Sequence, residues 1–330
     1  MPLPELKLIW RLRRYSRHQR AARSRANAIA TGIGDDCAVL RIPPGHEILA
    51  TTDFSLEGVH FRREWHPAES VGHRCLARGL SDIAAMGGDP IAAFLSLALP
   101  KGTRQNWVDR FFKGFLNLAA EFNVSLAGGD TSQSPDGVLA DIIMVGSVPK
   151  TNAILRSGAR PGDRIYVTGE LGGSAATLDL LYSGRKKKLD PRRFPNHFFP
   201  TPRVNIARVL REKQMATSMI DISDGLSTDL SHICAESRVG AKVWASALPL
   251  ATVAGRKVDL ELALHGGEAY ELLFTAKRGI RVPTQIVTVP VTCIGEIVRR
   301  KNLTLVRTNR TRTSLPVRGW QHFQQLTPDK

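Results

Sequence analysis

The sequence predicts an α/β protein of two domains, and three observations support this fold class. The 330 residues suffice for one large domain or two ordinary ones. Hydrophobic residues make up 42% of the chain and charged residues 23%, which is typical of a soluble globular protein. Helical and strand-like patterns alternate irregularly. A boundary near 149–153, followed by a turn-rich segment at 156–163, separates two halves of similar size, so we expect one domain over 1–150 and another over 151–330.

The first half opens with an amphipathic helix. Its leading stretch is rich in arginine, as transit peptides are, but four apolar residues follow roughly helical spacing and favour a helix that starts the domain. These residues are Leu6, Ile9, Trp10 and Leu12. The pattern then predicts strands over 47–52, 91–99, 124–127 and 139–148 and helices over 70–86 and 106–122. Asp53 would end the first strand, and Ser70 would be the N-cap of the second helix.

The second half carries more glycine turns. A glycine-rich turn at 169–173 and a basic, proline-bearing connection at 184–202 interrupt its elements. Strands are predicted over 164–168, 217–222 and 286–297, helices over 174–182, 203–214 and 226–236, and a glycine turn followed by a strand over 263–275. No G-x-x-x-x-G-K-[ST] string occurs, so this is not a P-loop protein.

Acidic residues recur at the edges of apolar segments. Asp35 and Asp36 form an adjacent pair behind a Gly-x-Gly, and further acids stand at Asp53, Asp82, Asp130, Asp221 and Asp224. One such pair is most often a solvated turn, yet this chain has 46 basic residues and only 30 acidic ones. Hard cations such as Mg²⁺ prefer oxygen ligands, usually carboxylates supplemented by water and substrate phosphates. We therefore expect one acidic, Mg²⁺-filled phosphate site built from distant parts of the chain.

Charge and cysteine usage narrow the classes of partner and compartment. The net charge of +16 attracts polyanions such as nucleotides, phosphorylated metabolites or nucleic acid. Basic runs at 11–25, 185–193 and 299–312 are more typical of solvated faces than of a nucleic-acid surface. The four cysteines form no C-x-x-C, which fits a reducing cytoplasm, and no apolar run approaches the ~18 residues needed to span a membrane.

A series of motifs in a fixed order then identifies a family. They are GIGDD, TTD followed by G-x-H-F, LSDIAAMGGDP, LAGGDTS, RSGARPGD, DISDGLSTDL, HGGEAYELLFT and GWQHF. The set resembles the thiamine-monophosphate kinase family over nearly the whole chain. That family belongs to an ATP-binding superfamily with aminoimidazole ribonucleotide synthetase and selenophosphate synthetase. The resemblance implies an aminoimidazole-ribonucleotide-synthetase-like fold with mixed sheets flanked by helices. It also implies a cytoplasmic homodimer that pairs through the N-terminal domain.

The same resemblance implies roles for individual residues. Metal ligands for several Mg²⁺ ions are implied at Asp36, Thr51, Thr52, Asp53, Asp82, Asp130, Asp221 and Asp224. ATP contacts are implied at Gly129, Asp130, Arg156 and Ser223, and thiamine contacts at His60, Glu268 and Trp320. No residue is implied as a general base. Three positions depart from the common family pattern, namely Gly79, Gln133 and Ala269, and all three lie near positioning elements.

The implied reaction transfers the γ-phosphoryl group of ATP to thiamine monophosphate. The second pKa of a phosphate monoester is near ~6, so its attacking oxygen is already ionised and needs no base. Glu268 would pair with the cationic thiazolium or the aminopyrimidine, Trp320 would stack on a ring, and His60 would donate to the phosphate. Structural alternatives are a plain strand histidine at 60 and a packed tail anchor at 320. Two other functions stay open: a related ATP- and Mg²⁺-dependent enzyme with another acceptor, and a non-catalytic polyanion-binding protein.

Overall fold

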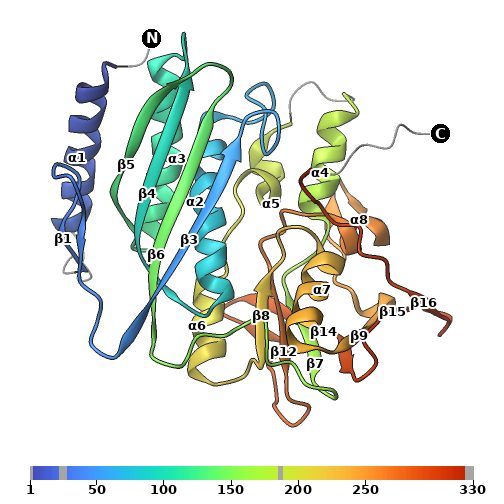
Figure 1. Cartoon of the computed structure of the whole chain (residues 1–330). Coiled ribbons are helices and arrows are strands. Elements are labelled where there is room, and N and C mark those ends of the chain that lie inside the picture. Colours follow the sequence, from blue (N-terminus) through green and yellow to red (C-terminus); the bar gives the residue numbers. More distant parts are fainter. Residues whose placement is uncertain (1–2, 22–27, 185–188, 324–330) are drawn as a thin grey trace. The chain divides into compact units, whose positions relative to one another are not determined.

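The computed structural model describes residues 3–21, 28–184 and 189–323 and divides the chain into two compact units. Unit 1 contains 1–153 and 187–212, and unit 2 contains 154–186 and 213–330. The chain is an α/β protein with a mixed sheet in each unit (Figure 1). None of the helices in the described ranges is long and apolar enough to cross a bilayer. The basic runs at 11–25 and 185–193 lie partly outside these ranges.

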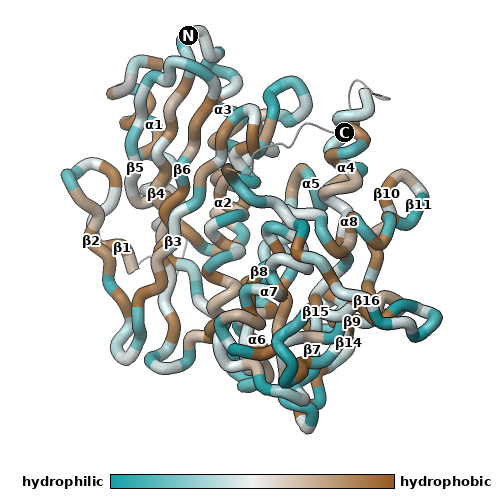
Figure 2. The backbone as a smooth tube through the Cα atoms, turned by 45° about the vertical axis from the view of Figure 1, so that its right-hand side comes forward, coloured by the Kyte–Doolittle hydropathy of each residue, from teal (hydrophilic) through white to brown (hydrophobic). Residues whose placement is uncertain are grey.

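Unit 1 is a four-stranded sheet with helices packed against it. Its elements are α1 (Glu5–Ala21), β1 (Ile29–Thr31), β2 (Val39–Leu40), β3 (His46–Leu56), α2 (Ala68–Ala85), β4 (Asp89–Pro100), α3 (Gln105–Glu121), β5 (Ser125–Ser134), β6 (Leu139–Pro149), the short α5 (Pro195–Phe198) and α6 (Val204–Glu212). The strand order is β3-β6-β4-β5, and only β4 and β5 are parallel. Hydrophobic segments run along β4 and β6 in Figure 2, and α2 packs against both strands. The apolar stripe of α3 packs against α2 and β5, and its Phe111 and Phe115 are fully buried.

The strands of unit 1 run further than the sequence predicted. We expected β3 to stop at Asp53, but it continues to Leu56 with an unbroken register on β6, so Asp53 lies inside a strand. We expected β5 to stop before the two glycines, but it continues through them to Ser134. The predicted N-cap was wrong, since α2 starts at Ala68 and Ser70 lies inside it, where its hydroxyl donates to the carbonyl of Phe198. The functional segments are therefore strand and helix positions rather than flexible loops.

Unit 2 is built on a larger sheet in the order β16-β15-β9-β14-β7-β12-β8, with β13 paired to β14. Its strands are β7 (Arg164–Thr168), β8 (Ser218–Asp221), β9 (Gly240–Trp244), β12 (Leu272–Ala276), β13 (Gln285–Ile286), β14 (Val289–Val298), β15 (Leu303–Val306) and β16 (Arg312–Ser314), with a small hairpin of β10 (Thr252–Val253) and β11 (Arg256–Lys257). Its helices are α4 (Gly173–Tyr182), α7 (Leu226–Ser237) and α8 (Leu260–His265). Buried side chains of β7, β8, β12 and α7 form its core.

One segment of the second half belongs to the first unit. We expected 151–330 to form one domain, but 187–212 groups with unit 1. Two arginines of α6 explain the attachment. The Nε of Arg208 donates to the Asp89 carboxylate at 2.6 Å, and the buried Arg211 donates to the same carboxylate at 3.1 Å. Since both arginines bind one acid at the start of β4, α6 is fixed beside α2 and completes unit 1.

Candidate functional site

The first group of candidate residues lies between β3 and α2. Alternate residues of a strand face the same side, and here Thr51 and Asp53 both face α2. The Thr51 hydroxyl donates to the Asp82 carboxylate at 2.5 Å, and Arg78 donates to Asp53 at 3.1 Å. Arg78 is buried, and Asp53 and Asp82 are half-buried. This group therefore combines two carboxylates and a hydroxyl with one arginine, which sequence reasoning missed although it stands one helical turn before Asp82.

Thr52 lies on the opposite face of the sheet. Its hydroxyl donates to the Asp141 carboxylate at 2.7 Å, away from Thr51 and Asp53. The reason is that successive side chains of a strand point to opposite faces of the sheet. The motif assigned Thr51, Thr52 and Asp53 as three consecutive ligands without regard to this alternation. The structure thus brings Thr51, Asp53 and Asp82 together, and it leaves the Thr52 side chain with Asp141.

A second group in unit 1 lines a cavity of about 520 Å³. Asp36, Gly129 and Asp130 contribute to its rim, while apolar side chains of α1, α3, β4 and β5, such as Phe94 and Phe112, form much of its wall. Gly129 has a φ of 142°, and a Cβ there would lie 1.9 Å from a β4 carbonyl oxygen, so no other residue fits. A largely apolar cavity with carboxylates at its rim suits a ligand that carries both a ring and cation-bound phosphates.

His60 lies in the turn that follows β3, so the alternative of a plain strand histidine is wrong. The backbone N–H of Leu56 donates to its Nδ1 at 3.0 Å. In the neutral ring the proton must then be on Nε2, which makes Nε2 a donor. The buried Arg74 of α2 donates to the His60 carbonyl at 3.3 Å and also to that of His197, so the backbone of the turn is anchored to the helix.

In unit 2, main-chain hydrogen bonds join three distant segments around one loop. The loop at 222–225 connects β8 to α7 and carries Ser223 and Asp224. The N–H of Glu268 donates to the Ser223 carbonyl at 2.7 Å, and the N–H of Trp320 donates to the Asp224 carbonyl at 2.9 Å. Asp221 stands buried at the end of β8, next to this loop. Main-chain hydrogen bonds thus join Ser223, Asp224, Glu268 and Trp320 in space, although up to 97 positions separate them in the sequence. These four are predicted nucleotide, metal or substrate residues.

The backbone around Glu268 is under conformational strain. Glu268 and Tyr270 have φ of 59° and 52°, a region that side chains other than glycine seldom occupy. Gly267 is required before them, because a Cβ there would lie 2.6 Å from the Ser223 carbonyl oxygen. The N–H of Tyr270 donates to the Ile222 carbonyl at 2.9 Å and helps to hold the strained turn. Such strain is common where a fold fixes a side chain for binding.

A buried acid beneath this loop escaped sequence reasoning. Asp229, in the first turn of α7, is 1% exposed and accepts the N–H of Gly225 at 3.0 Å and that of Asp224 at 3.3 Å. Burial, followed by the charges of Asp221 and Asp224, raises its pKa to about 8. The motif DISDGLSTDL contained the signal, since position 229 falls in the first turn after Asp224. Asp229 thus supports the loop from inside the unit.

Trp320 is fixed by its main chain rather than by its ring. Trp320 is 55% exposed. The residue before it, Gly319, donates its N–H to the Thr228 hydroxyl at 3.0 Å. A Cβ on Gly319 would lie 2.2 Å from the Asp224 carbonyl oxygen, so only glycine allows this approach. The alternative of a tail anchor packed on its own domain therefore applies to the backbone, while the ring is exposed and lies edge-on to the ring of His322.

Arg156 stands apart from this loop. Its carbonyl accepts the hydroxyl of Ser237 at 3.1 Å, and Ser237 is the last residue of α7, whereas Ser223 precedes the first. A helix of 12 residues is about 18 Å long, so the two backbones lie at opposite ends of α7. The structure does not bring Arg156 together with Ser223.

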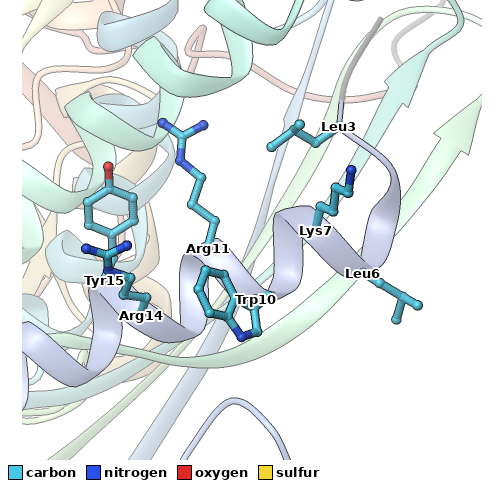
Figure 3. Close-up of a pocket in the computed structure, with 7 residues that line it drawn as sticks. All are labelled: Leu3, Leu6, Lys7, Trp10, Arg11, Arg14 and Tyr15. Carbon is cyan, nitrogen blue, oxygen red and sulfur yellow. The ribbon is translucent and has the colours of Figure 1, made fainter.

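Two further observations concern a second cavity and the grouping of possible metal ligands. A larger cavity of about 920 Å³ follows the outward face of α1 and is lined by Leu3, Leu6, Lys7, Trp10, Arg11, Arg14 and Tyr15 (Figure 3). It contains none of the candidate residues. Within the described ranges, no three histidine, cysteine or acidic side chains are grouped to hold a metal ion.

Two family models match most of the chain. The AIR synthase related protein N-terminal domain matches residues 34–148, and the corresponding C-terminal domain matches residues 160–283. Together with the two units, these matches define a two-domain protein of the AIR synthase related class.

Comparison with individual proteins narrows this class. The chain is 39% identical over 310 residues to a thiamine-monophosphate kinase of Salmonella typhimurium, which covers 89% of this chain and 92% of that protein. The crystal structure of a thiamine-monophosphate kinase from Stenotrophomonas maltophilia K279a is 34% identical with a TM-score of 0.79, covering 88% and 94% of the two chains. AaThiL complexed with AMPPCP and TMP is 30% identical with a TM-score of 0.75, covering 89% and 93%. The chain belongs to the thiamine-monophosphate kinase family.

Proposed function

We propose that this protein transfers the γ-phosphoryl group of ATP to the phosphate of thiamine monophosphate, forming thiamine diphosphate and ADP. The observation that carries the proposal is the loop at 222–225. It joins Ser223 and Asp224, suited to a phosphate or its counterion, to Glu268 and the exposed ring of Trp320. An acceptor with a phosphate at one end and a cationic aromatic ring at the other fits these neighbours. Family membership supports the same acceptor, since a related structure is complexed with AMPPCP and TMP.

The chemistry requires positioning and charge compensation rather than proton transfer. The attacking phosphate oxygen is ionised at neutral pH, because the second pKa of a phosphate monoester is near ~6. The obstacle is repulsion, which for two unit charges ~4 Å apart amounts to about 4 kcal/mol at an effective dielectric of roughly 20. We therefore assign no general base. The chain orients the donor and acceptor for in-line transfer and supplies groups that lower the repulsion.

The acidic residues of both units are suited to Mg²⁺. Carboxylate and hydroxyl oxygens are the donors that this ion prefers, and each ion usually takes only one or two carboxylates from the protein and the rest from phosphates and water. This small number of carboxylates per ion is consistent with the described residues, among which no three such side chains are grouped. The residues that would hold Mg²⁺ are Asp36, Thr51, Asp53, Asp82, Asp130, Asp221 and Asp224, with Thr52 contributing through its main chain. Bound Mg²⁺ would neutralise charge on the transferring phosphoryl group.

The substrate residues have separate tasks. His60, with its proton held on Nε2 by the Leu56 N–H, donates to the phosphate of the acceptor. Glu268 pairs with the thiazolium or the aminopyrimidine, and its strained backbone fixes the direction of the carboxylate. Trp320 stacks on a ring of the acceptor. Gly129 admits the nucleotide close to the backbone of β5. Arg156 stays a predicted ATP contact, although it lies at the other end of α7 from Ser223.

We further propose that two copies pair through the outward face of the unit 1 sheet. Ile48 and Phe54 of β3 and Ile143 of β6 are 62%, 52% and 39% exposed on that face. Large apolar side chains grouped on one sheet face are typical of an interface. Sedimentation of the wild-type protein and of Phe54→Lys tests this: we expect a dimer and a monomer, and a monomeric wild type would refute the pairing.

The decisive experiment is formation of thiamine diphosphate by the pure protein from thiamine monophosphate, ATP and Mg²⁺. Absence of product, with turnover of another phosphate acceptor from a panel, would identify a related enzyme instead. Absence of any turnover, with steeply salt-dependent binding to nucleic acid, would identify a polyanion-binding protein.

A further inference from the structure

The inward side of α1 holds an arginine without a partner. Leu8 and Leu12 are buried, and the hydroxyl of the buried Ser16 donates to a β5 carbonyl at 2.8 Å, so this side of the helix is fixed on unit 1. Arg13 follows Leu12 and lies over Gly34, where a Cβ would come within 2.3 Å of the guanidinium carbon. Its Nε is buried and has no hydrogen-bond partner in the described structure.

This arrangement is costly for a side chain of this kind. Arg13 as a whole is half-buried and its Nε is the buried atom; because a guanidinium keeps its charge at all relevant pH values, this Nε cannot avoid the cost by losing a proton. A buried charged donor without an acceptor loses the hydration it would have in water. The neighbouring Arg11 shows the usual solution, since it donates to Asp109 at 2.7 Å. Within the described ranges Arg13 has no such ion pair, although Asp35 and Asp36 follow Gly34 directly.

The arginine stands at the edge of the 520 Å³ cavity. Gly34, which it covers, lines that cavity together with Asp36, Gly129 and Asp130. The described residues that line it include no lysine or arginine. A polyphosphate entering this cavity would meet carboxylates, and Arg13 is a protein cation positioned beside them. Its donors match phosphate oxygens, which guanidinium groups bind in a bidentate manner.

We propose that Arg13 is a nucleotide-binding residue whose guanidinium contacts the phosphate chain of the nucleoside triphosphate. The inference rests on the proposed function for the presence of ATP in this cavity. It adds a contact from α1 that no motif of the sequence indicated. The exposed Arg14 is the matched control, because it is the next residue, carries the same charge and lines the separate cavity on the outward face of α1 (Figure 3).

The test compares binding of ATP and of adenosine by titration calorimetry in Mg²⁺ buffer. In Arg13→Gln we expect ATP affinity to fall by about ten- to a hundredfold, the loss of a charge-assisted hydrogen bond, with adenosine affinity unchanged. Arg13→Lys should recover part of the ATP affinity, and Arg14→Gln should match the wild type. Equal melting temperatures of the variants establish that each is folded.

Two results would overturn the assignment of Arg13. One is wild-type ATP affinity in Arg13→Gln, and the other is an equal loss for ATP and adenosine, which would mean that Arg13 only shapes the cavity. If the wild-type protein binds ATP but forms no thiamine diphosphate, the proposed acceptor is wrong and the assignment of Arg13 as a nucleotide-binding residue still stands. A wild-type protein that does not bind ATP would remove both.

Discussion

Replacing Asp229 by asparagine should change how the stability of the protein depends on pH. The carboxyl is buried beneath the loop at 222–225, and burial and two nearby acids raise its pKa from 3.8 to about 8. Between these values the folded protein keeps the proton while the unfolded chain releases it. Stability therefore falls as the pH rises through this window, because the folded state binds more protons.

The magnitude follows from the two pKa values. Each pH unit between them costs about 1.4 kcal/mol of unfolding free energy, so the whole window is worth on the order of 5 kcal/mol. The stabilising effect of the protonated carboxyl is complete below pH 3.8 and is lost above about pH 8. Asparagine has similar size and keeps an oxygen for the N–H groups of Asp224 and Gly225, but it does not titrate.

Denaturant unfolding at pH 5 to 9 in buffer with a chelator measures this directly. Subtracting the wild-type curve from that of Asp229→Asn cancels the titration of groups that do not interact with Asp229, and the difference should grow in favour of the variant up to about pH 8. A second variant, Asp224→Asn, removes one neighbouring charge that raises the pKa of Asp229. The fall in stability should then be smaller and end at lower pH than in the wild type, because the pKa of Asp229 decreases and less proton uptake accompanies folding. Parallel curves for the wild type and Asp229→Asn would refute the reasoning.

Three further variants test the division of labour in the site. Asp53→Asn preserves volume and removes a charged ligand, so turnover at limiting Mg²⁺ should fall on the order of tenfold or more. The protein should stay folded with a lowered melting temperature, because the buried Arg78 loses its ion pair; wild-type turnover at limiting Mg²⁺ contradicts the metal role. Glu268→Gln should weaken the binding of thiamine monophosphate by about ten- to a hundredfold and leave ATP affinity unchanged, as calorimetric titration of each ligand would show. An equal loss of ATP affinity would place Glu268 in the nucleotide site. Because the Trp320 residue is 55% exposed, Trp320→Ala should lower the unfolding free energy by less than about 1 kcal/mol. The same variant should bind thiamine monophosphate about tenfold more weakly, because it loses the stacking contact with a cationic ring. An unchanged KM for thiamine monophosphate would show that the Trp320 ring does not contact the substrate.

The regular elements were predictable because their patterns are local. The stripe of α3, the inward alternation of β6 and the strand β7 each depend on spacing within one segment, and the structure confirms them. The strands β15 and β16 were missed, because they are short and form only by pairing with β9 and with each other; β16, at the edge of the sheet, is also polar. The ends of β3 and β5 were also missed, since strand length depends on the neighbour that supplies hydrogen bonds.

The site was predictable as a set of residues but not as an arrangement. The glycines of the turn at 266–267 suggested a backbone that comes close to a ligand, which stays a prediction; in the structure Gly267 lies against the carbonyl of Ser223. The positive φ of Glu268 had no signal, because glutamate seldom adopts it. Arg13 was missed because it lies over Gly34, a residue of a distant segment. Asp229 was missed because its burial depends on the fold, although its hydrogen-bond partners Asp224 and Gly225 are close in sequence.

The route of the chain between its two units has a consequence for synthesis. The chain leaves unit 1 at residue 153, enters unit 2, returns for 187–212 and then leaves again. While it emerges from the ribosome, unit 1 cannot bind α6 until about 60 residues after its sheet is complete, and Asp89 must wait for Arg208 and Arg211. By then the first strand of unit 2 has appeared without its sheet. The two units must therefore mature together, and neither half of the chain should yield a well-folded fragment when expressed on its own.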